Sequence, residues 1–258
     1  MRVVVSMRFS NSPLVSYTNL TKNKTTNRNQ NITRITPHCF VGQVSAKRGC
    51  DYFATTPKKA SCNYVVGYDG QIGLSVEEKD KSWCSSSDSN DQRAITVEIA
   101  SDAVDPYKIT DAALEGFIKL CIDICKRYEK KRLVWISNKT QALAYKVKND
   151  ELLITIHKWF AAKECPGAYI ISKLPYIVET VNNELNGVEN TMTKEELKKF
   201  IEKTVREMGN GEPASTWAAP LVEEAKSMGI TDGSNPQGLA TRQEVAIMAM
   251  RAAQVQNK

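Results

Sequence analysis

The sequence is poor in histidine, with only two in 258 residues. His38 ends the apolar, β-prone run 32–37, and His157 ends the run 152–156. Cys165 follows the second histidine by eight residues. Two imidazoles and one thiolate are a set of three zinc ligands that leaves the fourth tetrahedral position open for water. The pattern therefore suggests an open zinc site of the hydrolase type.

Long apolar runs are also missing from the sequence. No window approaches the roughly 18 apolar residues of a membrane-spanning helix, and the apolar stretch at the N-terminus is too short for a signal peptide. The seven cysteines are odd in number and have no framework spacing, so we expect most of them to be reduced thiols. We therefore expect no membrane span, no disulfide scaffold and synthesis without a signal peptide.

Positive charge is concentrated in the N-terminal part. Residues 1–186 contain 26 Lys and Arg against 19 Asp and Glu (+7), whereas residues 187–258 contain 9 against 10 (−1). A basic surface of this kind suits nucleic acid, an anionic lipid surface or an anionic cell-wall polymer. The sequence has no basic helix with interleaved aromatics and no closely spaced four-ligand zinc motif, which argues against nucleic acid.

Apolar periodicity predicts alternating strands and helices. The predicted strands are 32–37, 63–68, 71–76, 94–100, 133–136 and 152–157. Asp69-Gly70 predicts a hairpin between the second and third of them. Amphipathic helices are predicted over 110–131, with Thr110 as N-cap, and over 169–186. This order favours an α/β fold with a mixed central sheet flanked by helices.

The chain is expected to have three parts. Residues 10–186 form the catalytic domain, and residues 187–212 form a helical linker with a charged helix over 193–208. Residues 213–258 form a small helical module, in which a turn at 229–233 precedes a helix from Thr241.

Glu98 and Lys163 are candidate catalytic residues. Glu98 lies within an apolar strand, where an unpaired buried carboxylate costs several kcal/mol, so the residue is either at the sheet margin, paired or poised beside a metal-bound water. Lys163 precedes Cys165 by two residues, which places its ammonium where it could stabilise an oxyanion. A solvated strand face and an exposed lysine are the simpler interpretations.

Five segments carry a resemblance to a known family. They are 37–43, 63–70, 82–87, 90–98 and the stretch from His157 through Lys163-Glu164-Cys165-Pro166-Gly167. Together they resemble the zinc-dependent N-acetylmuramoyl-L-alanine amidases of the amidase-2 family, which is related to T7 lysozyme and the peptidoglycan recognition proteins. The match is closest to phage and prophage endolysins of clostridia-like Gram-positive bacteria.

The resemblance implies a role for each of these candidates. The zinc ligands fall on His38, His157 and Cys165, the general base on Glu98 and the oxyanion-stabilising lysine on Lys163. The implied reaction is hydrolysis of the amide between N-acetylmuramic acid and L-alanine in bacterial peptidoglycan. In one departure, Cys62 occupies the position of a tyrosine that some members use.

Four further residues are expected to bind substrate. Trp83 and Ser85 lie in a loop that could line the groove, although Trp83 could equally be a packed loop residue. Asn63 and Asn90 lie in the segments that carry the resemblance. Cys121 and Cys125 lie on the apolar stripe of the predicted helix 110–131, which favours core packing over a second metal site.

The C-terminal module resembles a single S-layer-homology-like repeat, through segments 216–220, 225–233 and 240–246. This resemblance implies binding to an anionic cell-wall polymer, with packing on the catalytic domain or self-association into a homo-oligomer as alternatives. The endolysin resemblance implies accumulation in the bacterial host cytoplasm and release to the wall by a holin. The alternative functions are a non-catalytic peptidoglycan-recognition protein, a zinc endopeptidase acting on the stem peptide and a zinc-stabilised nucleic-acid-binding protein.

Overall fold

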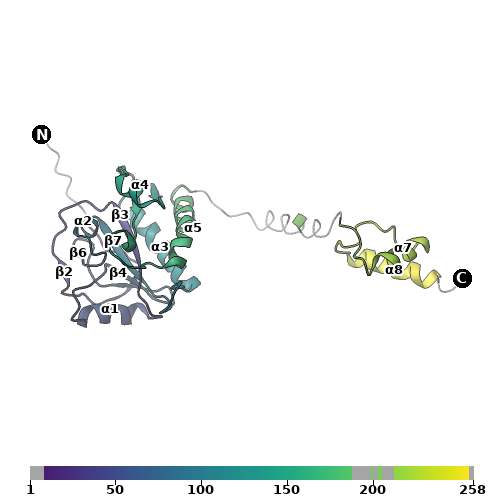
Figure 1. The fold of residues 1–258 in the computed structure, drawn as a ribbon, viewed down its shortest axis with the longest axis horizontal. Coiled ribbons are helices and arrows are strands. Elements are labelled where there is room, and N and C mark those ends of the chain that lie inside the picture. Colours follow the sequence, from purple (N-terminus) through teal and green to yellow (C-terminus); the bar gives the residue numbers. More distant parts are fainter. Residues whose placement is uncertain (1–8, 188–198, 200–202, 205–211, 256–258) are drawn as a thin grey trace. The chain divides into compact units, whose positions relative to one another are not determined.

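The computed structural model describes residues 9–187, 199, 203–204 and 212–255. The chain divides into two compact units, residues 1–189 and 190–258, and each is described by itself (Figure 1). The predicted charged helix over 193–208 falls almost entirely outside the described residues.

A seven-stranded mixed sheet forms the centre of the first unit, with strand order β1-β5-β4-β7-β3-β9-β8. Neighbouring strands are parallel except in the β4–β5 hairpin, which the Asp69-Gly70 signal predicted. The strands are β1 (Val15–Thr18), β3 (Arg34–Cys39), β4 (Tyr64–Val66), β5 (Ile72–Leu74), β7 (Ala94–Ile99), β8 (Arg132–Val134) and β9 (Glu151–Ile154). A separate antiparallel pair consists of β2 (Lys24–Thr25) and β6 (Lys81–Ser82). The prediction of a mixed sheet flanked by helices is confirmed.

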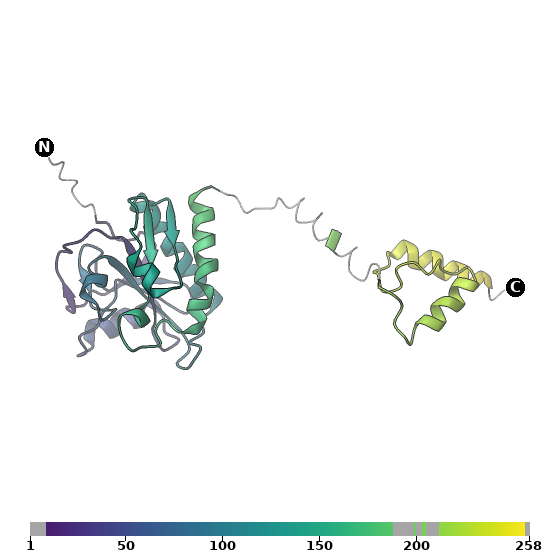
Figure 2. The ribbon, with the colours of Figure 1, turned by 45° about the horizontal axis from the view of Figure 1, so that its top comes forward.

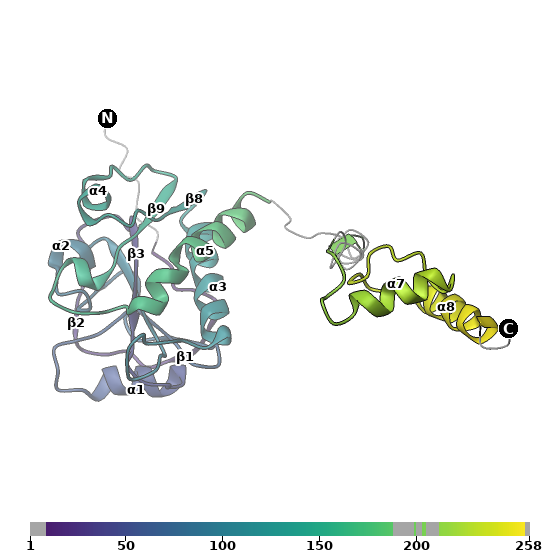
Figure 3. The same cartoon turned by 45° about the vertical axis from the view of Figure 1, so that its right-hand side comes forward.

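Two long helices cover one face of the sheet. They are α3 (Asp111–Arg127) and α5 (Ala168–Leu185), which pack against each other (Figures 2 and 3). Thr110 caps α3 by accepting a hydrogen bond from the backbone N–H of Ala113, as predicted. Cys121 and Cys125 are buried in the core between α3 and the sheet, so their expected packing role is confirmed.

Shorter helices lie elsewhere around the sheet. They are α1 (Ala46–Thr55), α2 (Asp88–Asp91), α4 (Lys139–Ala144) and the 3₁₀ turn η1 (His157–Trp159). The sequence analysis missed α1, and also β1 and β2, which precede the first predicted strand. Gly49 in the middle of α1 lowers helix propensity. A side chain there would put its Cβ 2.5 Å from the Val65 side chain, so the glycine lets α1 pack closely on β4.

The second unit contains α7 (Ala219–Ser227) and α8 (Arg242–Val255), in agreement with the predicted helical module. Thr241 and Glu244 form a reciprocal capping box at the start of α8. No residue of either helix is buried within this unit. Among the residues described in both units, no helix is long and apolar enough to cross a membrane.

A buried ion-pair network fixes α3 and the segment before β1 to the sheet. The Glu78 carboxylate is fully buried and accepts hydrogen bonds at 2.5 Å from the hydroxyls of Tyr64 and Tyr128. Arg127 donates to both of its oxygens, at 2.6 and 3.0 Å. The backbone N–H of Glu78 donates to the side chain of Asn11. The network therefore depends on one negative charge.

Glu78→Gln is expected to destabilise the first unit by about 1.5–3 kcal/mol, because it removes the buried charge that Arg127 and the two tyrosines bond to, while Arg127 keeps its ion pair with Asp123. Glu77→Gln is the matched control, since Glu77 forms only partly exposed ion pairs worth about 1 kcal/mol or less. Urea unfolding of both variants measures the difference. A Glu78→Gln protein within 1 kcal/mol of the unsubstituted protein would contradict the expectation.

Candidate active site

The candidate residues meet at the carboxyl ends of three adjacent parallel strands. His38 is the penultimate residue of β3 and pairs in register with Glu98 of β7. Paired residues of neighbouring strands project from the same face of a sheet. His157 opens η1, shortly after β9, the other neighbour of β3. The strand order therefore brings together residues that lie 59 to 119 positions apart in the chain.

Cys165 reaches this edge from the loop between η1 and α5. Its backbone oxygen accepts a hydrogen bond from the N–H of Lys158, at 2.9 Å, which ties the loop back to η1. Its Sγ lies 3.2 Å from His38 Nδ1, and the rings of His38 and His157 have centroids 5.0 Å apart. One potential ligand atom from each of these three residues lies within 4.8 Å of the other two.

The chemistry of this group fits a zinc ion. The pKa of His38 is lowered well below its usual range, chiefly by burial and then by His157. The pKa of His157 is lowered by burial and by the positive charge of Lys163. Both imidazoles are thus held neutral, the form that binds metal. His38 Nε2 is buried and has no hydrogen-bond partner.

Cys165 also contacts the Cys39 thiol. This hydrogen bond, with burial, raises the pKa of Cys165 above its usual range in the metal-free protein. A metal ion displaces the proton of a coordinating thiol outright. The Cys39 thiol therefore contacts the candidate ligand Cys165. The sequence analysis did not predict this contact.

Glu98 occupies a shielded position beside these ligands. Its Oε2 atom is buried without a partner, and Oε1 accepts a hydrogen bond from Cys84 Sγ at 3.7 Å. Burial is the main cause that raises the pKa of Glu98 to about 8, and the Cys84 contact opposes the rise. A carboxylate with such a pKa is suited to accept a proton near neutral pH. Of the alternatives left open by the sequence, the structure favours a carboxylate poised beside the ligands.

Lys163 lies on the exposed surface of the Cys165 loop and close enough to His157 to affect its pKa. Its position is compatible with the oxyanion role. Cys62, at the position where some relatives have a tyrosine, is fully buried among Cys50, Phe53 and Val65. It is therefore a packing residue of the α1 core.

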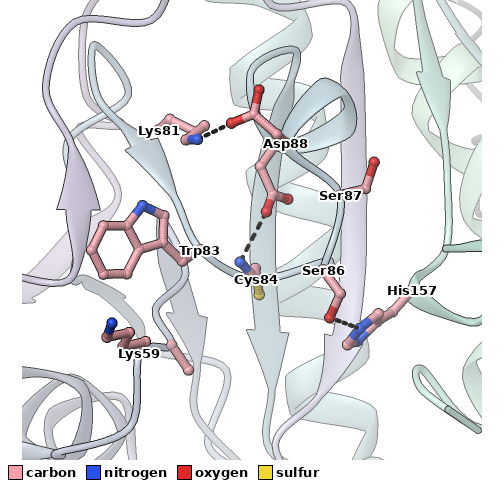
Figure 4. Close-up of a pocket in the computed structure, with 10 residues that line it drawn as sticks. Lys59, Lys81, Trp83, Cys84, Ser86, Ser87, Asp88 and His157 are labelled. Atoms are coloured by element: carbon pink, nitrogen blue, oxygen red, sulfur yellow. Dashed lines mark hydrogen bonds and ion pairs between the residues drawn. The ribbon is translucent and has the colours of Figure 1, made fainter. Parts of the chain in front are cut away.

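A pocket of about 350 Å³ adjoins the ligands. Its lining residues are Lys59, Ala60, Lys81, Trp83, Cys84, Ser86, Ser87, Asp88, Asp91 and His157. Figure 4 shows Trp83 and Lys59 on one side and Ser86 with His157 on the other. The Ser86 hydroxyl lies 3.1 Å from His157 Nε2. Trp83 thus lines the pocket, one of the two positions that the sequence left open for it.

Asn63, Ser85 and Asn90 do not line this pocket, and their expected role as substrate contacts stays a prediction. All three are fully buried and their polar atoms bond within the protein. Asn63 accepts from the N–H of Thr96 and donates to the oxygen of Val76, both at 3.1 Å. Such residues position the strands and the loop of the site.

Asn90 illustrates this supporting role. Its amide donates to the hydroxyl of Thr36 and its oxygen accepts from that of Thr155, so it links β3 to the segment that follows β9. The Ser85 hydroxyl donates to Asp91 at 2.5 Å. The sequence shows that these residues are polar and lie near the motifs, but not that they point inward.

The sheet edge, the ligand cluster and the shielded carboxylate together define a site suited to a hydrolase. The family model for N-acetylmuramoyl-L-alanine amidases matches residues 17–168. The chain belongs to the N-acetylmuramoyl-L-alanine amidase family, whose members hydrolyse the amide between muramic acid and the stem peptide. The match covers every candidate metal and catalytic residue.

Solved structures with a similar fold include an endolysin amidase and a hydrolase. The endolysin N-acetylmuramoyl-L-alanine amidase LysCS from Clostridium intestinale is 17% identical over 69% of this chain and 98% of that one, with a TM-score of 0.45. Staphylococcus aureus hydrolase AmiA, solved with its ligand, is 16% identical over 68% of this chain and 85% of that one, with a TM-score of 0.47. No curated protein sequence matches the chain.

Proposed function

We propose that this chain is a zinc-dependent peptidoglycan amidase of the endolysin type. The observation that carries the proposal is the convergence of His38, His157 and Cys165 beside the half-buried Glu98, whose Oε2 atom is buried without a partner. These three residues would hold the ion. Zinc, when bound, polarises a carbonyl and lowers the pKa of water.

The other residues supply proton transfer and charge stabilisation. Glu98 accepts a proton from the attacking water and passes it to the leaving nitrogen of L-alanine. Lys163 stabilises the negative charge that develops on the lactyl carbonyl oxygen. Trp83 provides an apolar wall for the substrate chain.

Mass analysis of digested cell walls tests this function against its alternatives. Purified Gram-positive peptidoglycan treated with the zinc-loaded protein is expected to release lactyl-muramic glycan and new L-alanine amino termini. Cuts elsewhere in the stem would indicate a zinc endopeptidase. Wall binding without any new termini would indicate a recognition protein.

The biological setting belongs to the same proposal. We place the protein in a phage or prophage of a Gram-positive host, with synthesis in the host cytoplasm and holin-dependent access to the wall. Residues 10–186 act as the catalytic domain and 187–212 as a helical linker. Residues 213–258 act as an S-layer-homology-like module that binds an anionic wall polymer or a second copy of the chain.

A further inference from the structure

The pocket beside the ligands has an uneven distribution of charge. One end is formed by His157 and the loop that carries Cys84 (Figure 4). Lys59 and the indole of Trp83 lie on the opposite side, and Lys81 lies at a third place on the rim. A ligand that fills the pocket from the metal side outward therefore meets an aromatic wall and then an ammonium group.

The two lysines of the pocket differ in whether they form an ion pair within the protein. Lys81 is largely buried and forms an ion pair with Asp88, so its charge is already compensated. Asp91, the other acid of the lining, accepts hydrogen bonds from Ser85 and from the N–H of Cys84. Within the part of the chain that the structure describes, Lys59 takes part in no ion pair and no side-chain hydrogen bond. It is the uncompensated cation of the pocket.

The Trp83 side chain is held in place rather than free to rotate. Its indole N–H donates to the Thr25 hydroxyl at 2.9 Å, and its backbone N–H donates to the Ser61 hydroxyl at 2.9 Å. Its ring thus forms a fixed wall next to Lys59 (Figure 4). Fixed walls with a few placed polar groups are what specific ligand pockets use.

We propose that Lys59 recognises the free α-carboxylate of the second residue of the stem peptide, and so makes the enzyme selective for isoglutamate over isoglutamine. This inference rests on the proposed function. The glycan side of the scissile amide is neutral, whereas the peptide side carries carboxylates, so a pocket with an uncompensated cation suits the peptide side. L-alanine is followed by glutamate linked through its γ-carboxyl group, and its α-carboxylate is the first anionic group beyond the scissile bond.

The test uses two synthetic muropeptides that differ only in having an α-carboxylate or an α-carboxamide on the second stem residue. Calorimetry measures the Kd of each, and kinetics measure kcat/KM. The proteins are the unsubstituted chain, Lys59→Gln and the control Lys58→Gln. Lys58 is the exposed neighbour of Lys59 on the same loop and lies outside the pocket.

The unsubstituted protein is expected to bind the carboxylate form roughly two- to fivefold more tightly, as for an ion pair made by the exposed Lys59 side chain. Lys59→Gln is expected to remove this ratio by weakening only the carboxylate form, and Lys58→Gln to preserve it. Added salt should shrink the ratio of the unsubstituted protein, because salt screens an exposed charge pair.

Equal Kd values for the two muropeptides, no binding of either, or a ratio that survives in Lys59→Gln would overturn the inference. Cleavage of both substrates with equal Kd values would leave the amidase function intact and refute only the role of Lys59. A Lys59-dependent Kd ratio without cleavage would support the inference and refute the proposed function.

Discussion

His157→Ala is expected to abolish both zinc binding and wall hydrolysis. The substitution removes one of three protein ligands, and the remaining His38 and Cys165 cannot complete the coordination of a catalytic zinc site. Removal of an outer-shell partner of a ligand typically costs about 10- to 100-fold in metal affinity or activity, so removal of a ligand itself should cost more. Metal content after dialysis and the turbidity of a wall suspension measure the two losses.

Lys158→Ala is the matched control for this experiment. Lys158 is the next residue of η1, and its side chain forms an exposed ion pair with Glu164. Such a pair is worth about 1 kcal/mol or less, so the control should retain zinc and activity. If His157→Ala kept a full equivalent of zinc, the ligand assignment would be wrong.

Glu98→Gln is expected to lower kcat by about 10²- to 10⁴-fold, the usual contribution of a general acid–base. Zinc content should stay at one equivalent, because Glu98 is assigned to proton transfer and not to the ligand set. The amide preserves the size of the side chain and can still accept the hydrogen bond from Cys84, so the fold should be unaffected.

Metal content and kcat are measured on the same preparation of Glu98→Gln. Glu115→Gln serves as its control, since Glu115 lies on the exposed face of α3 and pairs only with Lys119. Full activity of Glu98→Gln would refute the base assignment, and loss of zinc in this variant would make Glu98 a ligand.

These two predictions separate the roles of residues that the sequence could only place near one another. The second group of potential ligands, formed by His38, Cys84 and Glu98, shares His38 with the first. Glu98 could in principle belong to either set. Zinc retention in Glu98→Gln decides between them.

The sequence predicted the sheet because its strands are apolar runs separated by turn signals. Nearly every residue of β3, β7 and β9 is buried, and β7 and β9 are mostly apolar, which is typical of parallel strands covered on both faces. It also predicted α3 and α5 from their apolar periodicity. It missed α1, where Gly49 and low apolar content hide a helix whose position depends on packing against Val65.

The candidate metal and catalytic residues came from residue type, spacing and family resemblance. The direction in which a side chain points could not be predicted in this way, as Asn63, Ser85 and Asn90 show. Each is polar and lies close to a motif, yet each points inward and bonds within the fold. Only the fold therefore shows which polar residues near a site face the pocket and which bond within the protein and hold the site in place.

The sequence alone determined which groups this protein can use: two imidazoles, a thiol, one carboxylate within an apolar strand and a nearby lysine. The chemical groups follow from the residue types, and the place of the carboxylate in an apolar strand follows from the local pattern of apolar residues. The tertiary structure decided which of them meet, because only the order β7-β3-β9 brings the ends of distant strands to one edge. The tertiary structure also placed Cys39 in contact with Cys165, Cys84 in contact with Glu98, and Lys59 in the lining of the pocket. The spacing of these residues in the sequence does not predict that they are neighbours.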